Sequence, residues 1–393
     1  MTMSEELPAL GTELPHIGCL NAQLRTLQAS GPIHRVRTPA GDEGWLVTRY
    51  AELIELLMDD RVGKSHPDAP NMPKYLDNRL LNLSVSADHA EARENHAQMR
   101  ARLTPLFSPK RMSALRPKIA ERVTVALDAI IDKGSPADLH GQLAVPVSFH
   151  VLCDLLGIPD GDADTFMGLL AGPTTVDSQG DIGPRGLPLA RYLKEMAAHK
   201  RAHPAGDLIS GLCETVAADD LVAALVAVTA FSYLVTPHNI SVGIALLASH
   251  PDQRDKIVAE PTLLATAVEE VLRMGKTTES RLPRYASEDI DIADVTIQAG
   301  DLVMCDHYAP AFDDRIFDHP DQFDVTRSPN PHPAFSHGRW YCVGAPLARV
   351  EMLEVYGGLL TRLPHVSLQV PLTELRVTSD QLGGGIAELP VAW

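Results

Sequence analysis

Apolar residues recur along most of the chain with the period of an α-helix. Between residue 113 and Gly134 they return every fourth position, which predicts an amphipathic helix that ends at the glycine. The segment "VLCDLLGIPDGD" predicts the end of another helix at a proline turn. The residues that carry the four-residue period are Leu115, Ile119, Val123, Leu127 and Ile131.

Strand patterns are short and few. Residues 32–50 alternate polar and apolar positions around Gly41 and Asp42, which predicts a β-hairpin. Further short strands are expected at residues 366–370 and in the C-terminal "LPVAW". The pattern as a whole therefore predicts a mainly α protein with small β-sheets.

The longest apolar segment covers residues 221–249 and is long enough to cross a membrane. Polar residues interrupt its middle, and no basic residues flank it, so we expect the buried central helix of a large helical protein instead. A kink is expected near Pro237. The interrupting residues are Ser232, Thr236, His238 and Asn239, together with the proline.

Length and composition set wide limits. A chain of 393 residues forms two domains or one large helical one, and no repeat or linker divides it. The N-terminus shows neither a secretory signal nor a membrane anchor, so we expect a cytoplasmic protein without a membrane partner. The net charge of -17 disfavours nucleic acid as a partner. The 5 cysteines are scattered, with no CxxC pair, which supports neither a disulfide framework nor a zinc site.

Positive charge is concentrated in one stretch of this acidic chain. Residues 95–120 contain no acidic residue, which predicts a local basic patch. Its positive residues are Arg100, Arg102, Lys110, Arg111, Arg116 and Lys118.

One cysteine stands in an unusual setting, within "FSHGRWYCVGAPLARVEM". Gly338 and Gly344 permit backbone conformations that other residues resist, and a helix is expected from Ala345 to Met352. Cys342 therefore lies just before a helix N-terminus, where the dipole and free N–H groups favour a thiolate suited to a metal. The plain alternative is a buried structural cysteine.

The pattern around this cysteine resembles the haem-binding loop of the cytochrome P450 superfamily. Phe335, Gly338, Cys342 and Gly344 match it, and "LAR" follows at residues 347–349. The resemblance implies haem b as the cofactor, Cys342 as the iron ligand, and Phe335 and Gly344 as parts of the haem-binding loop.

The same resemblance implies the architecture. Residues 1–393 would form a single cytochrome P450 domain, one large helical domain around a buried haem. Its β-rich part would cover about residues 30–65, and the helical core with the haem loop residues 90–360.

A second family motif is "AVEEVLRMG", where Glu270 and Arg273 lie three residues apart on one helix face. Such a pair on a surface would contribute a few tenths of a kcal/mol, roughly. In the family it is a buried structural clamp, completed here by Arg327.

Further motifs imply contacts to the haem propionates. His96 and Arg100 in "HAQMR" match one propionate-binding pair, and Arg284 matches another ligand. Many relatives carry a basic residue two positions before the cysteine, where this chain has Trp340. Its neighbour Arg339 is the candidate substitute.

The chain departs from the family again in the apolar segment. Leu234 and Val235 occupy the positions of an acid–alcohol pair that relays protons during oxygen activation. Protons would then come from water, from the substrate, or from Ser232, Thr236 or His238.

Several residues are expected to line the substrate pocket by their place in the family. For most of them simple core packing is the competing interpretation. They are Phe231, Leu234, Val235, Thr236, Phe166, Met167, Thr277 to Leu282, Gly383 to Ile386, and the loop 72–84.

A narrower resemblance concerns the substrate. "AFDDRIF" and the "LPVAW" ending look like the bacterial branch that oxidises cyclic dipeptides, by coupling or hydroxylation. The alternative is a hydroxylase of a polyketide, terpenoid or aromatic metabolite.

Electrons would come from ferredoxin and ferredoxin reductase. The basic patch would attract an acidic ferredoxin by electrostatic steering. Two other hypotheses are a non-catalytic haem-thiolate binding or sensing protein and an enzyme that uses peroxide directly.

Overall fold

The computed structural model describes residues 7–11, 17–76, 85–171, 182–275, 281–378 and 385–393. The chain divides into two compact units. Unit 1 comprises residues 1–98, 272–323 and 329–342, and unit 2 comprises residues 99–271, 324–328 and 343–393.

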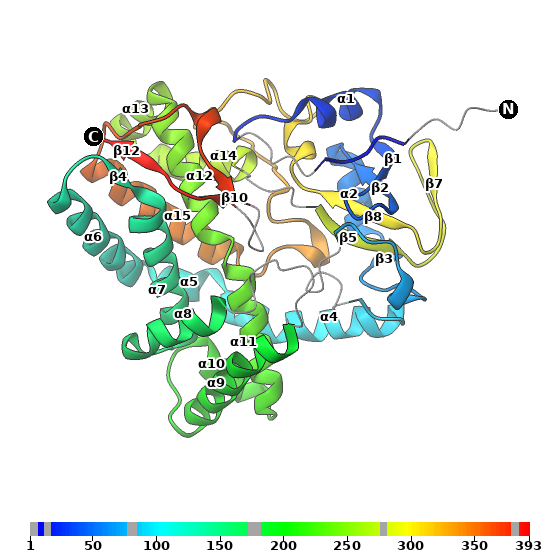
Figure 1. The fold of residues 1–393 in the computed structure, drawn as a ribbon, viewed down its shortest axis with the longest axis horizontal. Helices are drawn as coiled ribbons and strands as arrows, with labels where there is room; N and C mark the ends of the chain where they lie inside the picture. The colour runs from blue at the N-terminus through cyan, green and yellow to red at the C-terminus, as the bar shows by residue number, and fades with distance from the viewer. Residues whose placement is uncertain (1–6, 12–16, 77–84, 172–181, 276–280, 379–384) are drawn as a thin grey trace. The chain divides into compact units, whose positions relative to one another are not determined.

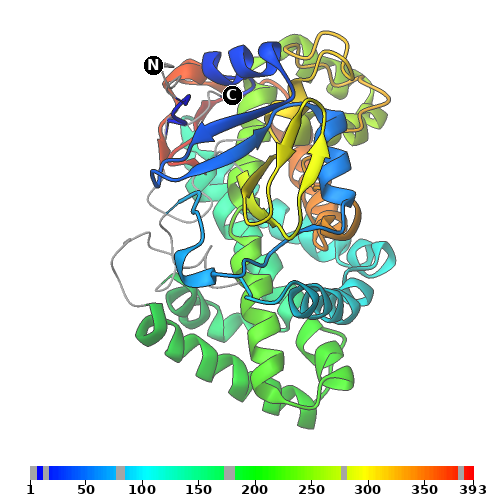
Figure 2. The same cartoon turned by 90° about the vertical axis from the view of Figure 1, so that its right-hand side faces the viewer.

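Unit 1 is built around a five-stranded sheet in the order β1-β2-β8-β5-β3 (Figure 2). Strands β2 and β8 pair in parallel, and the other neighbours are antiparallel. The hairpin predicted for residues 32–50 is confirmed, with Ile33 opposite Val47. The strands of this unit are β1 (Ile33–Arg37), β2 (Glu43–Val47), β3 (Val62–Gly63), β5 (Arg281–Ala286), β6 (Ile290–Ile292), β7 (Val295–Ile297) and β8 (Leu302–Asp306).

Helix α2 (Tyr50–Met58) covers this sheet with a leucine face. Leu53, Leu56 and Leu57 are fully buried and pack with Val47 and Val303 of the strands. Burial of each such side chain stabilises the fold by about 1.5–3 kcal/mol. Helix α1 (Ala22–Ser30) precedes β1. Asn21 caps its N-terminus, where the side chain accepts a hydrogen bond from the backbone N–H of Leu24.

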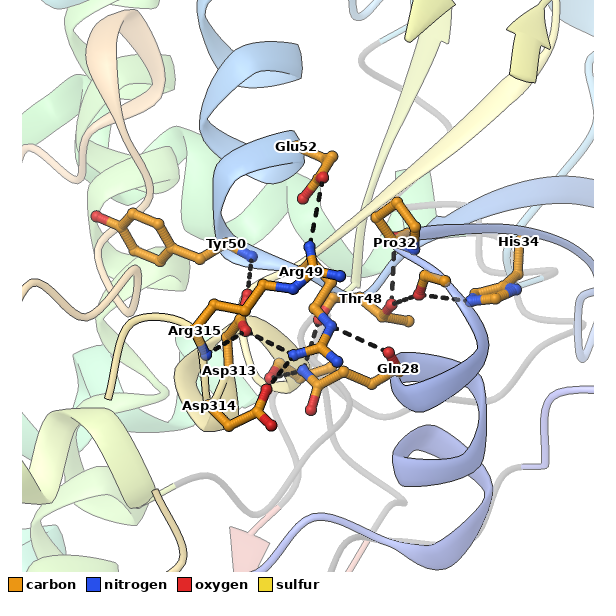
Figure 3. Close-up of polar contacts among 12 residues, drawn as sticks. Gln28, Pro32, His34, Thr48, Arg49, Tyr50, Glu52, Asp313, Asp314 and Arg315 are labelled. Carbon is orange, nitrogen blue, oxygen red and sulfur yellow. Dashed lines mark hydrogen bonds and ion pairs between the residues drawn. The ribbon is translucent and has the colours of Figure 1, made fainter. Parts of the chain in front are cut away.

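A polar cluster fixes the start of α2 (Figure 3). The buried guanidinium of Arg49 pairs with Asp313 at 2.6 Å and also with Asp314, and its Nε donates to the carbonyl of Gln28 at 3.0 Å. The backbone N–H of Tyr50 donates to Asp313 Oδ2 at 2.9 Å. Asp313 therefore satisfies a helix N-terminal donor and a buried cation together.

Unit 2 is mainly helical. Figure 1 shows α11 and α12 running end to end through it. Its helices are α5 (Pro109–Ala114), α6 (Arg116–Lys133), α7 (Val145–Leu156), α8 (Ala163–Ala171), α9 (Ile182–Ala202), α10 (Leu208–Thr215), α11 (Asp219–Tyr233), α12 (Thr236–Ser249), α13 (Pro251–Ala259) and α15 (Ala345–Arg362). Helices α4 (His89–Leu103) and α14 (Leu264–Met274) each begin in one unit and end in the other.

Small strands complete unit 2. The predicted C-terminal strands are confirmed: β12 (Pro390–Ala392) pairs with β9 (Ser367–Leu368) and with β4 (Ala137–Asp138). Strands β10 (Val377–Thr378) and β11 (Gly385–Ile386) form a separate pair. The mainly α architecture with small sheets is therefore the observed one.

The helix predicted from residue 113 begins later than expected. Helix α5 ends at Ala114, and α6 starts at Arg116 with a proline in its first turn and ends at Lys133, with Gly134 as its C-cap. A proline lacks the backbone N–H, so it is tolerated only where that donor has no intrahelical partner. The side chain buried in the last turn is that of Ile130, whereas the prediction placed Ile131 there.

The long apolar segment is interrupted, as the proline predicted. Leu234 and Val235 separate α11 from α12, and Pro237 lies in the first turn of α12. By length and composition, residues 219–249 would be apolar enough to cross a membrane, a test that core helices of soluble proteins also pass. Ten of the fourteen residues of α12 are buried within unit 2, which fits a core helix.

Candidate functional site

The loop before α15 presents a cysteine thiol. Cys342 is exposed and lies two residues before Gly344, the N-cap of α15. Its backbone N–H donates to the carbonyl of Phe335 at 2.8 Å, which closes the loop. By contrast, burial raises the pKa of Cys153 to about 12 and that of Cys305 to about 11. Cys342 is thus the cysteine placed at a helix N-terminus, where a thiolate is favoured.

Gly338 owes its place in the loop to its backbone conformation. Its φ is +55°, in the left-handed region that costs other residues about 1–2 kcal/mol. A Cβ atom there would also lie 2.4 Å from the sulfur of Met58. The glycine therefore permits both the turn and the close approach of α2.

Arg284 is a buried cation in the same unit as this loop. It lies on β5 with 4% of its surface exposed, and burial lowers its pKa. The guanidinium carbon lies 4.2 Å from the ring centroid of Trp340, a cation–π distance. One N–H group donates to the carbonyl of Pro283, but the buried Nε has no hydrogen-bond partner.

Trp340 brings two of the predicted residues together. The ring of His96, on α4, lies 4.5 Å from its ring, on which Arg284 also packs. The indole Nε1 of Trp340 is buried without a hydrogen-bond partner. Arg100 follows one helical turn after His96 on α4 and is half-buried.

Arg339 has a partner inside unit 1. Its guanidinium pairs with Asp60 and donates to the backbone carbonyls of Asp59 and of Val62, the latter at 3.4 Å. The hydrogen bonds from Arg339 and Arg93 hold the pKa of the Asp60 carboxyl below its usual value. The positive charge of Arg339 is thereby compensated, so its predicted contact to a propionate has no support from this geometry and stays a prediction.

Two of the three predicted clamp residues, Glu270 and Arg273, are completely buried. In unit 2, Glu270 pairs with Arg327 at 3.1 Å and accepts the backbone N–H of Asp324 at 3.0 Å. In unit 1, Arg273 donates to the carbonyls of Ala311 at 2.9 Å and Pro320 at 2.7 Å. Both side chains have zero exposure, so a surface pair is excluded.

Unit 2 contains a cavity of about 300 Å³ at the junction of α11 and α12. Leu234 and His238, both predicted site residues, line it together with Met167 of α8. Thr236 is buried and Ser232 is exposed, and neither lines this cavity. The other predicted pocket residues that the structure describes also lie outside its lining: residues 72–76, Phe166, Phe231, Val235, Arg281, Leu282, Gly385 and Ile386. Thr277 and the remaining predicted residues, 77–84, 278–280, 383 and 384, lie outside the described residues.

Phe166 belongs to the core of unit 2. It is fully buried and stacks on the rings of Phe149 and Tyr192, each with centroids 6.1 Å away. The core-packing interpretation therefore holds for this residue.

His238 lines the cavity beside a second imidazole, that of His140. Its ring stacks on His140 at 5.1 Å, and a Cβ atom at Gly385 would come within 2.2 Å of its Nδ1. Burial, with a smaller contribution from His140, lowers the pKa of His238 to about 4. The ring is therefore neutral at pH 7 and does not itself carry a proton to donate as an imidazolium.

A buried acid was missed by sequence reasoning. Glu351 on α15 accepts hydrogen bonds from Ser148 Oγ at 2.6 Å and from the phenol of Tyr233. Burial raises its pKa to about 7, although both hydrogen bonds oppose the shift. Tyr233 and Ser148 also line the cavity. The one signal in the sequence was an acidic residue on the buried face of a helix.

Some of the positive residues of the basic patch form ion pairs with acidic residues from other helices. Arg116 pairs with Glu354 at 2.6 Å, and Lys118 pairs with Asp154 at 2.6 Å. The stretch 95–120 lacks acids in sequence, but α15 and α7 supply them. Lys110 and Arg111 at the start of α5 are exposed.

Comparisons with known proteins agree with this arrangement. A sequence model of the family described as cytochrome P450 matches residues 219–374. Pentalenolactone synthase from Streptomyces exfoliatus is 36% identical, over 99% of this chain and 100% of its own. Mycinamicin IV hydroxylase/epoxidase from Micromonospora griseorubida is 32% identical, over 93% of this chain and 94% of its own.

A solved structure is similar over the same length. Substrate-free cytochrome P450 PimD, described as a polyene macrolide antibiotic pimaricin epoxidase, is 43% identical. It covers 99% of this chain and 100% of its own, with a TM-score of 0.91. The fold and the cysteine loop thus define a haem-thiolate oxidoreductase of the monooxygenase class. The chain belongs to the cytochrome P450 family, and haem b is its cofactor.

The residues of unit 1 fit such a cofactor. Haem b carries carboxylates on its edge, and a buried Arg284 with an unpartnered Nε is suited to a carboxylate. The unpartnered indole Nε1 of Trp340 offers a further donor to the same kind of group.

Proposed function

We propose that the protein hydroxylates or epoxidises a macrolide or a related polyketide. The mycinamicin enzyme and the pimaricin epoxidase carry these activities in their names, and both match nearly the whole chain. The observation that carries this proposal is the 43% identity to the pimaricin epoxidase over 99% of this chain. Neither relative is described as acting on a cyclic dipeptide, so that substrate stays a prediction.

Cys342 is the proposed iron ligand, with Phe335 and Gly344 shaping its loop. When bound, a thiolate-ligated haem supplies oxygen activation. His96, Arg100 and Arg284 are the proposed propionate ligands. The Arg284 part of this proposal is supported by its burial and unpartnered Nε.

The chain must also hold protons where Leu234 and Val235 replace the usual pair. We propose Glu351 as the group that holds one, because its pKa of about 7 leaves it partly protonated at neutral pH. Tyr233 Oη bonds to this carboxyl and lines the cavity, so it can pass a proton to a group bound there. Ser232, Thr236 and His238 remain predicted contributors.

This proton route is tested with Tyr233→Phe. The variant keeps the ring but loses the hydroxyl, and turnover should fall roughly tenfold or more with unchanged substrate affinity. Unchanged turnover would remove Tyr233 from the route.

Electrons come from ferredoxin and ferredoxin reductase in our proposal. We also propose that the chain acts in the cytoplasm, as a single cytochrome P450 domain.

The substrate is tested by titrating the ferric protein with polyene macrolides, other macrolides and cyclic dipeptides. A haem spin-state shift that saturates with a macrolide, followed by oxygenated product with ferredoxin, reductase and NADPH, is expected. Tight binding of a cyclic dipeptide alone would contradict the proposal. Binding with no turnover would favour a sensing protein, and turnover with peroxide alone would favour direct peroxide use.

A further inference from the structure

Two basic side chains of unit 1, those of Lys64 and Arg284, are neighbours at the end of strand β3. Strand β3 pairs with β5 in antiparallel register, with Val62 opposite Ala286 and Gly63 opposite Tyr285. Lys64 directly follows Gly63, and Arg284 directly precedes Tyr285, so the two residues flank the last registered pair of these strands. The charge of Arg284 acts on the ammonium group of Lys64.

This pair of cations has no acidic partner among the described residues. Lys64 is half-buried, and its ammonium group makes no ion pair with any residue that the structure describes. Burial, followed by repulsion from Arg284, lowers the pKa of Lys64 to about 8. The groups that act on Arg284 are the thiol of Cys305 and the guanidinium of Arg339, which repels it. A buried cation beside a half-buried one, with no acidic counterion among the described residues, is unfavourable, so the arrangement calls for an anion.

Two further donors meet at Arg284. Its own Nε and the indole Nε1 of Trp340 are both buried without hydrogen-bond partners, and the guanidinium stacks on the indole ring at 4.2 Å. Trp340 carries no charge and occupies the position where many relatives have a basic residue. The geometry would let Lys64 supply the positive charge that Trp340 does not.

We propose that Lys64 binds a haem propionate, together with Nε of Arg284 and Nε1 of Trp340. A carboxylate would satisfy the two orphaned donors and neutralise the paired cations. The propionate is the source we favour because Trp340 lies two residues before Cys342 in the same loop. The inference rests on the proposed role of Arg284 in propionate binding.

The test is the rate at which ferric holoprotein loses its haem to excess apomyoglobin, followed in the Soret band. Lys64→Met should speed the loss of haem b about tenfold or more, because a charge-assisted hydrogen bond is removed. Lys64→Arg keeps the charge and should stay close to the wild type. Arg35→Met, at an exposed ion pair with Glu43 in the same unit, removes an equal charge and serves as the control.

Holoprotein reconstituted with haem dimethyl ester gives the second arm, since the ester has no carboxylates. Wild type and Lys64→Met should then lose the cofactor at equal rates. An equal acceleration by Lys64→Met with haem b and with the ester would overturn the proposal, and so would haem b loss at the wild-type rate.

Arg284→Met separates this inference from the proposal on which it rests. If it speeds haem b loss while Lys64→Met does not, Arg284 keeps its role and Lys64 loses its own. If neither variant changes the rate, both assignments fail. Circular dichroism of each variant verifies that the fold is retained.

Discussion

The phenol of Tyr233 donates to the buried carboxyl of Glu351. Tyr233 is the last residue of α11 and directly precedes the helix break at Leu234. An ionisable group thus lies beside Leu234 and Val235, the residues predicted to replace the family's acid and alcohol. Glu351 has zero exposure, so its protonation is coupled to the stability of unit 2.

This coupling predicts a pH-dependent stability. The native pKa of Glu351 is about 7, raised from an ordinary value of 4.5, so the native state binds the proton more tightly than the unfolded chain. The resulting stabilisation, on the order of 3 kcal/mol, is fully present below pH 4.5 and is lost as the pH rises through 7. Urea unfolding of wild type and Glu351→Gln between these pH values measures it.

Glu351→Gln should abolish that part of the pH dependence. Glu354→Gln on the same helix, at a partly exposed ion pair with Arg116, is the control and should keep the wild-type slope. If Glu351→Gln retained the full slope, the carboxyl would not be the titrating group.

The neighbouring acids Glu269 and Glu270 should differ sharply in their contribution to stability. Glu270→Gln leaves Arg327 without its buried counterion and should lower the free energy of unfolding by about 3 kcal/mol. Glu269 forms a partly exposed pair with Arg349 at 2.6 Å, so Glu269→Gln should cost less than about 1 kcal/mol. Equal losses in urea unfolding would contradict a buried clamp.

Gly338→Ala should destabilise the cysteine loop by about 1–2 kcal/mol through its left-handed backbone alone. Adding Met58→Ala relieves the close contact with the sulfur but not the backbone cost, so the double variant should recover only part of the loss. Thermal unfolding of the holoprotein measures the loss of stability in the single variant and in the double variant.

Gly168→Ala is the control for this series. No atom lies within 4 Å of a Cβ there, and the position is inside α8. Alanine should be neutral or stabilising. Full recovery by Met58→Ala would show that the contact, and not the backbone, fixes the glycine.

Reversing two charges of the basic patch should slow electron transfer. Arg111→Glu with Arg116→Glu should lower the rate of reduction by ferredoxin roughly tenfold at low ionic strength, with unchanged substrate affinity. Stopped-flow reduction measures this rate, and the difference should shrink at about 0.5 M salt.

Lys133→Glu with Arg191→Glu makes the same change in net charge on the far end of α6 and on α9. This double variant should change the rate of reduction by ferredoxin only slightly. A slowing that did not depend on salt would argue against electrostatic docking.

The sequence by itself determined the features that depend on neighbours a few residues apart. The hairpin of β1 and β2, the break before Pro237 and the helix after Gly344 were all predicted, because periodicity, prolines and glycines act locally. The cysteine loop could also be predicted from the sequence, because the residues that define it lie in one short stretch.

Tertiary structure alone decided which charges are paired and which are buried. Tyr233 and Glu351 meet across 118 residues, and Glu354 compensates Arg116 in a stretch that has no acid of its own. The pairing of β3 with β5, which brings Lys64 close to Arg284, joins segments more than two hundred residues apart. Burial and ion pairing follow from packing between distant segments, and local spacing carries no information about them.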